Sequence, residues 1–419
     1  MSQIRRLLIE DTPLEWRALL TVDDVPTRLA YLHHTRPISV LGMLTTAKVT
    51  AIDKRLNAAF LKLRNGEPGF LRRRGPMPAI GETILVEIKR EPIGEKGAEV
   101  SDAPTLRWPC ATWPLKAATL HEGPLGDPED VPFPFEDLEE AKARLRDGDE
   151  RLAAPLPYIL AALGADDLDE ILVTTPELKN DVQRYVPQGT PLFMDDRFKA
   201  AAEIDAAEEL ALSQEIALAD GGRLVVDEAE ALTAIDLDLG RAPGQSAKGA
   251  ADRLLGAALT ALGGYAQLAN LGGQIVVDVP RAAIASPKII RDRLMRTFKP
   301  LGRVSVPAVT PEGVCVVIAP KTGPSVLGRL TVSAGGGVRP GRDFAADVVA
   351  AKAWRALDRA LDQDRTGNPT LELRADAMAH FTPDGDVAAS LRARYGPRFT
   401  VRAFEEVSHG RPIPFRVSA

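Results

Sequence analysis

Cysteine is scarce in this sequence, which has only Cys110 and Cys315 among its 419 residues. The two cysteines lie far apart and form no CxxC pair, so the sequence contains no recognisable structural zinc site. Two isolated thiols also fit a reducing compartment. We therefore expect a cytoplasmic protein.

Aromatic residues and long apolar runs are rare as well. Aromatics make up 5% of the chain, and no apolar run reaches the roughly 18 residues that a membrane span requires. Met1–Glu10 lacks the pattern of a signal peptide, so we expect no membrane partner. The net charge of −6 argues against a surface that attracts nucleic acid everywhere, but it does not exclude a local basic channel.

The first third of the chain has the pattern of a small barrel followed by an irregular segment. With 419 residues, two to four domains are expected. Turn-separated β-rich segments at Ile38–Val49, Ala58–Leu63 and Thr83–Lys89 predict about five short strands in a β-barrel. The six prolines of Leu106–Phe135 predict a long irregular connection, and an acidic helix is expected over Glu136–Glu150.

From Pro155 onward the pattern alternates between helix and strand, which is typical of α/β structure. We expect long helices at Phe198–Ala219, Ser246–Leu268 and Pro287–Phe298. Val332–Asp343 is rich in glycine and predicts a hinge. The sequence then predicts a small module of helix (Ala345–Leu361), strand (Thr370–Arg374), helix (Asp386–Tyr395) and strand (Phe399–Phe404).

Short apolar runs that end in aspartate are the most informative motif. Leu-Thr-Ala-Ile precedes Asp236, with Asp238 just beyond, and Gln-Ile-Val-Val precedes Asp278. If the two strands are parallel and joined by one helix, both aspartates lie at the same edge of the sheet. Converging carboxylates repel unless a cation sits between them, and Mg²⁺ accepts one or two carboxylates together with water and phosphate oxygens. Taken singly, each aspartate is more often a turn former or a helix cap.

Several segments resemble the bacterial ribonuclease E/G endoribonucleases. GGRLVVDEAEALTAIDLDLG and LANLGGQIVVDVP are similar to the two catalytic segments of that family. LLIEDTPLEWRALL, NAAFLKL and PGFL are similar to its opening strands and to its OB-type RNA-binding barrel. The matching segments follow the family order over most of the chain.

The resemblance implies an α+β, multidomain fold. An RNase H-like subdomain would hold an inserted OB-fold barrel, a DNase I-like α/β catalytic subdomain would follow, and a small C-terminal α/β domain would finish the chain. The implied bounds are 1–35 with 150–220 for the RNase H-like subdomain, 36–105 for the barrel, 106–149 for a Pro-rich and acidic segment in place of the family's 5′-sensor, 221–335 for the catalytic subdomain, and 340–419 for the last domain.

The resemblance also assigns site residues. Asp236 and Asp278 would be catalytic and would bind Mg²⁺, and Asp238 occupies the position of an assisting asparagine. The RNA-binding residues would be Phe60, Phe70, Lys96, Arg72 and Lys321. The alternative interpretation of Phe60 is a core residue, whereas Phe70 has arginines just beyond it and is the better RNA candidate.

Departures from the family pattern limit what is expected. The Arg-Thr pair of the 5′-monophosphate sensor is not found, so no sensing of the RNA end is expected. TVSAGGGVRP has no cysteine, so no zinc-bridged tetramer is expected. The basic residues that flank the catalytic segments in the family are also thinned.

Two functions remain open on the sequence. The first is a Mg²⁺-dependent endoribonuclease that cleaves single-stranded RNA in rRNA processing or RNA turnover. The alternative is a catalytically idle RNA-binding or ribosome-maturation protein on the same scaffold. Retention of Asp236 and Asp278 favours the enzyme, and the thinning of basic residues favours the binding protein.

Overall fold

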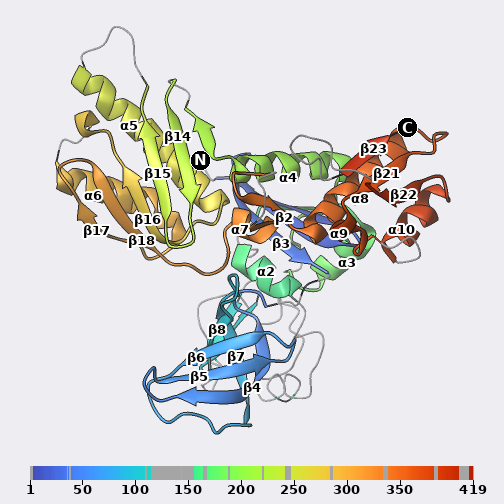
Figure 1. The fold of residues 1–419 in the computed structure, drawn as a ribbon, viewed down its shortest axis with the longest axis horizontal. Helices are drawn as coiled ribbons and strands as arrows, with labels where there is room; N and C mark the ends of the chain where they lie inside the picture. Colours follow the sequence, from blue (N-terminus) through green and yellow to red (C-terminus); the bar gives the residue numbers. More distant parts are fainter. Residues whose placement is uncertain are drawn as a thin grey trace.

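The structure is a computed structural model that describes residues 3–34, 36, 39–108, 111–114, 143, 155–163, 168–186, 189–218, 221–240, 247–283, 286–333, 338–381, 386–404 and 415–418. Figure 1 shows three parts around the N-terminal strands: a barrel below them, a second sheet on the left, and the C-terminal helices and strands on the right. The mixed α+β architecture with several sheets confirms the general fold class expected from the sequence.

The N-terminal sheet combines strands from both sides of the barrel sequence. Its order is β12-β11-β1-β2-β3, in which β1 pairs in parallel with β11 and antiparallel with β2. The alanine-rich helix α4 packs against β1 and β2, since alanine allows close approach of helix and sheet. The elements are β1 (Arg5–Asp11), β2 (Glu15–Val22), β3 (Val25–His33), α2 (Leu156–Leu163), β11 (Glu170–Val173), α3 (Pro176–Gln183), β12 (Leu192–Met194) and α4 (Arg197–Leu212).

The predicted small barrel is confirmed. β4, β5, β6, β8 and β7 close on one another in that order. β4 begins at Leu44 instead of Ile38, because Gly42 has a φ of 84° and makes a turn where an extended strand was expected. The strands are β4 (Leu44–Asp53), β5 (Ala58–Leu63), β6 (Pro68–Arg72), β7 (Thr83–Arg90) and β8 (Ala98–Ser101).

The segment after the barrel does not begin as the irregular connection predicted over Leu106–Phe135. β9 (Thr105–Trp108) and β10 (Ala111–Pro114) pair antiparallel, with Pro114 opposite Thr105. Proline is compatible with a two-stranded ribbon because its missing N–H can face away from the partner strand. Apart from Ala143, the expected acidic helix lies outside the described residues.

The second sheet has the order β13-β14-β15-β16-β18-β17. One face packs against α5 and α6, and alternation along the strands leaves the other face exposed. The elements are β13 (Glu215–Ala217), β14 (Arg223–Glu228), β15 (Thr233–Asp238), α5 (Ala247–Leu268), β16 (Gly273–Asp278), the 3-10 turn Arg281–Ala283, α6 (Pro287–Thr297), the 3-10 turn Lys299–Leu301, β17 (Ser305–Val309) and β18 (Val314–Ala319).

The helix predicted over Phe198–Ala219 is too long. α4 ends at Leu212, and Glu215–Ala217 joins the second sheet as β13. The buried Arg339 guanidinium donates hydrogen bonds to the carbonyl oxygens of Leu212 at 2.9 Å and Ser213 at 2.8 Å. A tertiary partner thus satisfies carbonyls at the helix end, which local sequence could not reveal.

The predicted C-terminal helices and strands are confirmed: α10 has the predicted bounds, and the ends of the other three elements differ by at most two residues. β21 pairs in parallel with β22 and antiparallel with β23. The predicted hinge Val332–Asp343 is instead a hairpin at its ends, since Val332 pairs with Asp343. The elements are α7 (Val326–Leu330), β19 (Thr331–Ser333), β20 (Arg342–Phe344), α8 (Ala346–Gln363), β21 (Thr370–Leu373), α9 (Ala375–Met378), α10 (Asp386–Tyr395), β22 (Thr400–Ala403) and β23 (Phe415–Ser418). No helix within the described residues is both long and apolar enough to span a membrane.

Candidate active site

Asp236 and Asp278 lie side by side on neighbouring strands of the second sheet. β15 and β16 run parallel, with Asp236 directly paired with Asp278, and α5 connects the two strands. Neighbouring strands are about 4.8 Å apart, and side chains at paired positions point to the same face of a sheet. The structure therefore brings the two aspartates together, as expected for the ends of two parallel strands joined by a helix.

Both carboxylates are exposed. Along β15, Ile235 and Leu237 are buried, whereas Asp236 and Asp238 face solvent. Along β16, Asp278 is exposed in the same way. These aspartates therefore carry no burial cost, and water or a phosphate group can approach them from the open side of the sheet.

Asp238 differs from the other two aspartates because it has partners. Its Oδ1 accepts a hydrogen bond from the Gly240 N–H at 3.1 Å, and its Oδ2 lies 3.6 Å from Nε of Arg223. Within the described part of the chain, no hydrogen bond or ion pair reaches the Asp236 or Asp278 carboxylate. Asp238 is thus held at the side of the pair.

The local charge is strongly negative. Arg223 forms ion pairs with Glu215 and Asp238 at this edge. The pKa of the Arg223 guanidinium is raised by its hydrogen bond to Glu215 and by the negative charges of Glu215, Asp238 and Asp236. Among the residues that the structure describes, no Lys or Arg side chain forms an ion pair with Asp278. The arrangement therefore favours a bound cation between Asp236 and Asp278.

These residues fit Mg²⁺ better than a metal that needs a full protein cage. The described residues contain no cluster of three or more His, Cys, Asp or Glu side chains that could hold a metal. Mg²⁺ is often held by one or two carboxylates with water and substrate phosphate completing its shell. Two exposed, adjacent carboxylates meet that requirement. We name Asp236 and Asp278 as the residues that would hold the ion.

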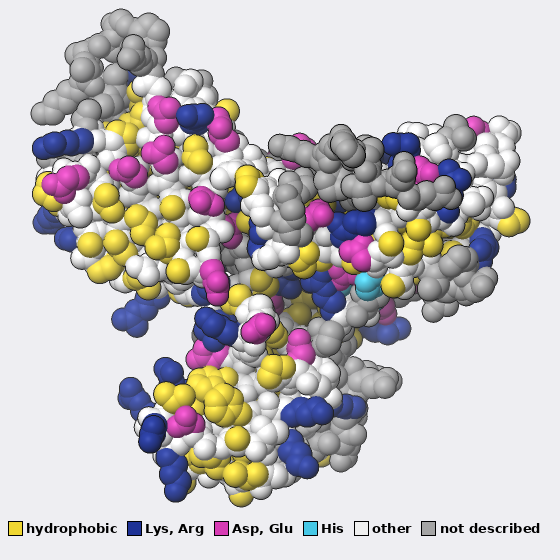
Figure 2. Space-filling view, in the orientation of Figure 1, with side chains coloured by type: hydrophobic (Ala, Val, Ile, Leu, Met, Phe, Trp, Pro, Cys, Tyr) yellow, Lys and Arg dark blue, Asp and Glu magenta, His cyan; other side chains and the backbone are white. Residues whose placement is uncertain are grey.

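The face around the pair is poor in basic residues. In Figure 2, hydrophobic and acidic side chains cover the middle of the second sheet, and Lys and Arg lie at its margins. The exposed hydrophobic residues on this face include Val314 and Ile318 of β18. Val314 is the residue paired with Asp278 on the side away from Asp236.

The barrel presents an aromatic pair at its surface. Phe60 and Phe70 are directly paired across β5 and β6, with ring centroids 5.6 Å apart in an edge-to-face arrangement. Phe60 is 44% exposed, so its interpretation as a core residue is wrong. Arg72 lies 5.9 Å from the centre of the Phe70 ring. Phe70 is half-buried, and Phe60 is therefore the more accessible of the two rings.

The two predicted lysines lie at different places. Lys96 is exposed in the turn before β8 and forms an isolated bridge with Ile93. Lys321 is exposed beside Gly273, at the start of β16, whereas Asp278 is at its end. Five residues of strand separate these points by about 17 Å at roughly 3.3 Å per residue. The structure therefore does not bring Lys321 to the aspartate pair.

A buried ionic cluster lies elsewhere, between the N-terminal sheet, α4 and α8. Arg17 is 0% exposed, and its guanidinium lies 2.7 Å from Glu10, 2.7 Å from Asp205 and 3.4 Å from Glu208. Arg355 of α8 donates to Glu10 at 2.9 Å. The remaining members are Glu15, His33, Arg36, Asp347 and Lys352.

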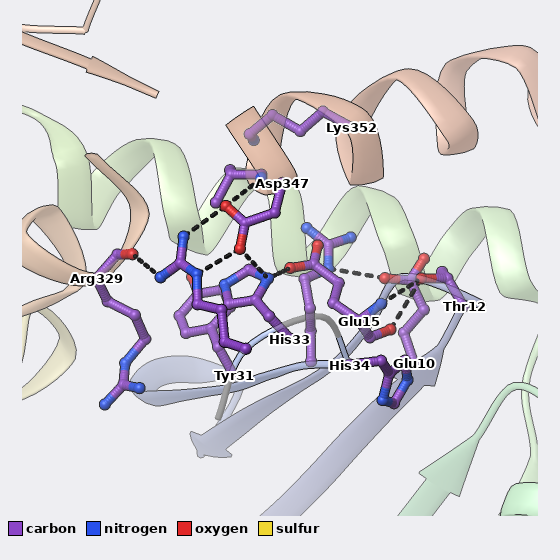
Figure 3. Close-up of polar contacts among 12 residues, drawn as sticks. Glu10, Thr12, Glu15, Tyr31, His33, His34, Arg329, Asp347 and Lys352 are labelled. Carbon is purple, nitrogen blue, oxygen red and sulfur yellow. Dashed lines mark hydrogen bonds and ion pairs between the residues drawn. The ribbon is translucent and has the colours of Figure 1, made fainter. Parts of the chain in front are cut away.

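Figure 3 shows how this cluster joins α8 to β2 and β3. Nδ1 of His33 lies 2.9 Å from Glu15 and 3.9 Å from Asp347. Burial alone would raise the pKa of the Glu15 carboxyl, but Arg355, His33 and Arg17 outweigh it and hold that pKa well below its usual value. The cluster connects the N-terminal strands to α4 and α8, which are far away in the sequence. No pattern along the chain predicted it.

Comparison with known proteins bears on the second sheet. Residues 155–293 match the family model described as Ribonuclease E/G family. The matched region contains β14, β15, α5 and β16, and therefore both aspartates of the pair. No curated protein matches the chain.

Proposed function

The chain belongs to the ribonuclease E/G family by its match over residues 155–293, and on that premise we propose that it is a Mg²⁺-dependent endoribonuclease acting on single-stranded RNA. Family membership implies an RNA substrate. The observation that carries the proposal is the direct pairing of Asp236 with Asp278 on the exposed face of the second sheet. A bound Mg²⁺ supplies an activated water and stabilises charge on the phosphate.

The residues of this chain have separate roles in the proposed reaction. Asp236 and Asp278 would hold the cation. Asp238, fixed by Arg223 and by the Gly240 N–H, can accept a hydrogen bond from an attacking water. Because the pair is open to solvent, water reaches it without any movement of the chain.

We also propose the subdomain assignments that the family resemblance implies. Residues 1–35 and 150–220 would form the RNase H-like subdomain, which is supported by the sheet order β3-β2-β1-β11-β12 with β2 antiparallel to β1. The closed barrel within 36–105 is compatible with an OB fold. Residues 221–335 would form the DNase I-like catalytic subdomain, and 340–419 the small domain.

The proposed cellular role follows from the family resemblance. We place the activity in the cytoplasm, in rRNA processing or RNA turnover, and expect no zinc-bridged tetramer because the linking cysteines are absent from the sequence. The catalytically idle RNA-binding protein remains the second candidate. It is favoured by the scarcity of basic residues near the aspartate pair and by the distance of Lys321 from that pair.

One assay separates the two candidates. Incubation with an unstructured RNA and Mg²⁺ is expected to produce internal cleavage, and excess EDTA should abolish it because two carboxylates without the ion cannot activate water at neutral pH. Binding to the same RNA in EDTA should persist through the barrel. Binding without any cleavage in Mg²⁺ would select the idle binding protein.

Phe60→Ala is expected to weaken RNA binding. A base stacked on an exposed aromatic ring contributes about 1–3 kcal/mol, so Kd should rise by roughly fivefold or more, measured by fluorescence anisotropy in EDTA. Ile80→Ala is the matched control, because Ile80 is 66% exposed on the same barrel but offers no aromatic face. Equal effects of the two substitutions would contradict base stacking at Phe60.

A further inference from the structure

Glu91 connects the barrel to the second sheet. It directly follows β7, the last barrel strand but one along the described chain. Its backbone N–H donates to the Thr322 carbonyl at 2.8 Å, and its carboxylate accepts a hydrogen bond from the Leu41 N–H at 3.1 Å. The same carboxylate forms an ion pair with Arg329 at the end of α7. The Glu91 carboxylate thus links the segment before β4 to α7, and its backbone N–H links the end of β7 to the segment after β18.

The segment that receives Glu91 is itself fixed to β16. Residues 320–325 follow β18, which pairs with β16 from Gly273 to Asp278. At Gly272, an added Cβ would lie 2.4 Å from the Pro320 carbonyl oxygen, so this segment packs directly on the start of β16. The Asn270 side chain also donates to the Pro324 carbonyl at 2.9 Å.

Gly323 shows how closely the two parts approach. A Cβ at this position would lie 2.8 Å from Oε2 of Glu91, so the carboxylate rests against the glycine backbone. The side chains of Glu91 and Arg329 are only 14% and 24% exposed. The pair is therefore screened less by solvent than a surface pair would be.

We propose that Glu91 is a positioning residue that fixes the RNA-binding barrel relative to the strands that carry the aspartate pair. The inference rests on the proposed nuclease function, because it concerns RNA that contacts both parts. Glu91 of the barrel contacts residues 322–323. These residues follow β18, which pairs with β16 as far as Asp278. RNA held on the barrel is thereby presented to the aspartates in a fixed register.

The barrel should stay folded when this link is broken. Apolar residues of α2 share a hydrophobic core with the barrel: Tyr158 and Ile159 belong to the same buried cluster as Leu44 and Ile88. Glu91 supplies orientation in addition to that contact. Loss of its charge should therefore loosen the barrel against the second sheet without unfolding it.

The test uses Glu91→Gln and Arg329→Gln in the full chain, with Glu99→Gln as the matched control. Glu99 pairs with Arg90 inside the barrel at 3.3 Å and does not bridge to the sheet. An OB-type barrel covers about 4–16 nucleotides, so an RNA of about 30 nucleotides can occupy both parts, whereas one of about four cannot. Cleavage of both RNAs and hydrogen exchange at the Glu91 amide are measured for each variant.

Both bridging variants are expected to lower kcat/KM on the long RNA by about tenfold and to leave cleavage of the short RNA unchanged. The double variant should lose no more than either single one, because both remove the same interaction. Exchange at residue 91 should rise in the bridging variants and not in Glu99→Gln. A general structural defect would instead lower cleavage of both RNAs.

Two outcomes would overturn the inference. One is an unchanged exchange rate at residue 91 in Glu91→Gln. The other is equal loss on the long and short RNAs. If the wild-type chain cuts neither RNA, the nuclease proposal fails, and the exchange data still decide whether Glu91 holds the two parts together.

Discussion

Replacing Asp278 with asparagine is expected to lower RNA cleavage by several orders of magnitude. The substitution keeps the shape of the side chain but removes one of the two charges that would hold Mg²⁺. The chemistry that a bound Mg²⁺ would supply is activation of water and stabilisation of charge on the phosphate, so loss of a residue that holds it would affect the chemical step directly. Single-turnover cleavage of an unstructured RNA at saturating protein measures that step without a contribution from binding.

RNA affinity should stay the same or rise in Asp278→Asn, because one negative charge near the phosphates is gone. Glu312→Gln is the matched control: Glu312 lies in the β17–β18 turn, next to the Gly313 carbonyl that accepts a hydrogen bond from the Val279 N–H. The Glu312→Gln substitution therefore removes a carboxylate at the same edge of the sheet but outside the β15–β16 pair. Cleavage that survives Asp278→Asn, or falls as far in Glu312→Gln, would remove the case for a two-aspartate metal site.

Replacing Arg17 with leucine is expected to lower the free energy of unfolding by about 3–5 kcal/mol. Arg17 is fully buried and lies between Glu10 and Glu208, which are themselves buried. Burial lowers the pKa of a guanidinium, but the charges of Glu10, Glu208 and Asp205 outweigh this and raise the pKa of Arg17. Its removal would leave carboxylates in the interior with fewer partners. Urea denaturation followed by circular dichroism measures the loss.

Arg402→Leu is the matched control for this effect. Arg402 forms an ion pair with Glu372 at 2.8 Å, but its side chain is 59% exposed, so the expected change is no more than about 1 kcal/mol. Arg17→Lys keeps the charge without the planar donor fork and should fall between the two. If Arg17→Leu were no more destabilising than Arg402→Leu, the buried cluster would not stabilise the packing of the N-terminal sheet against α4 and α8.

Local patterns were sufficient for much of the fold. Turn-separated β-rich runs predicted the barrel, and apolar runs ending in aspartate predicted the β15–α5–β16 unit. Both depend on periodicities that are set within one element and its neighbours. Errors arose where a distant residue decided the outcome, as at the end of α4, where Arg339 satisfies the carbonyls of Leu212 and Ser213.

The residues of the candidate site could likewise be predicted from the sequence only in part. The sequence pointed to Asp236 and Asp278, but the sheet register decided that they pair directly. Register also placed Lys321 at the far end of β16 and gave Asp238 its contact with Arg223. The exposure of Phe60 was open on the sequence, because alternation identifies two faces of a strand and does not say which one a barrel turns inward.

The sequence by itself determined the barrel, the β15–α5–β16 unit and the two aspartates that follow apolar strands, because hydrophobic spacing and turn chemistry act over a few residues. Only the tertiary structure decided which charges meet. Arg17 with Asp205 and Glu208, and Glu91 with Arg329, join positions far apart in the chain. An ion pair depends on the distance between two side chains in space, and that distance is set by the packing of whole elements.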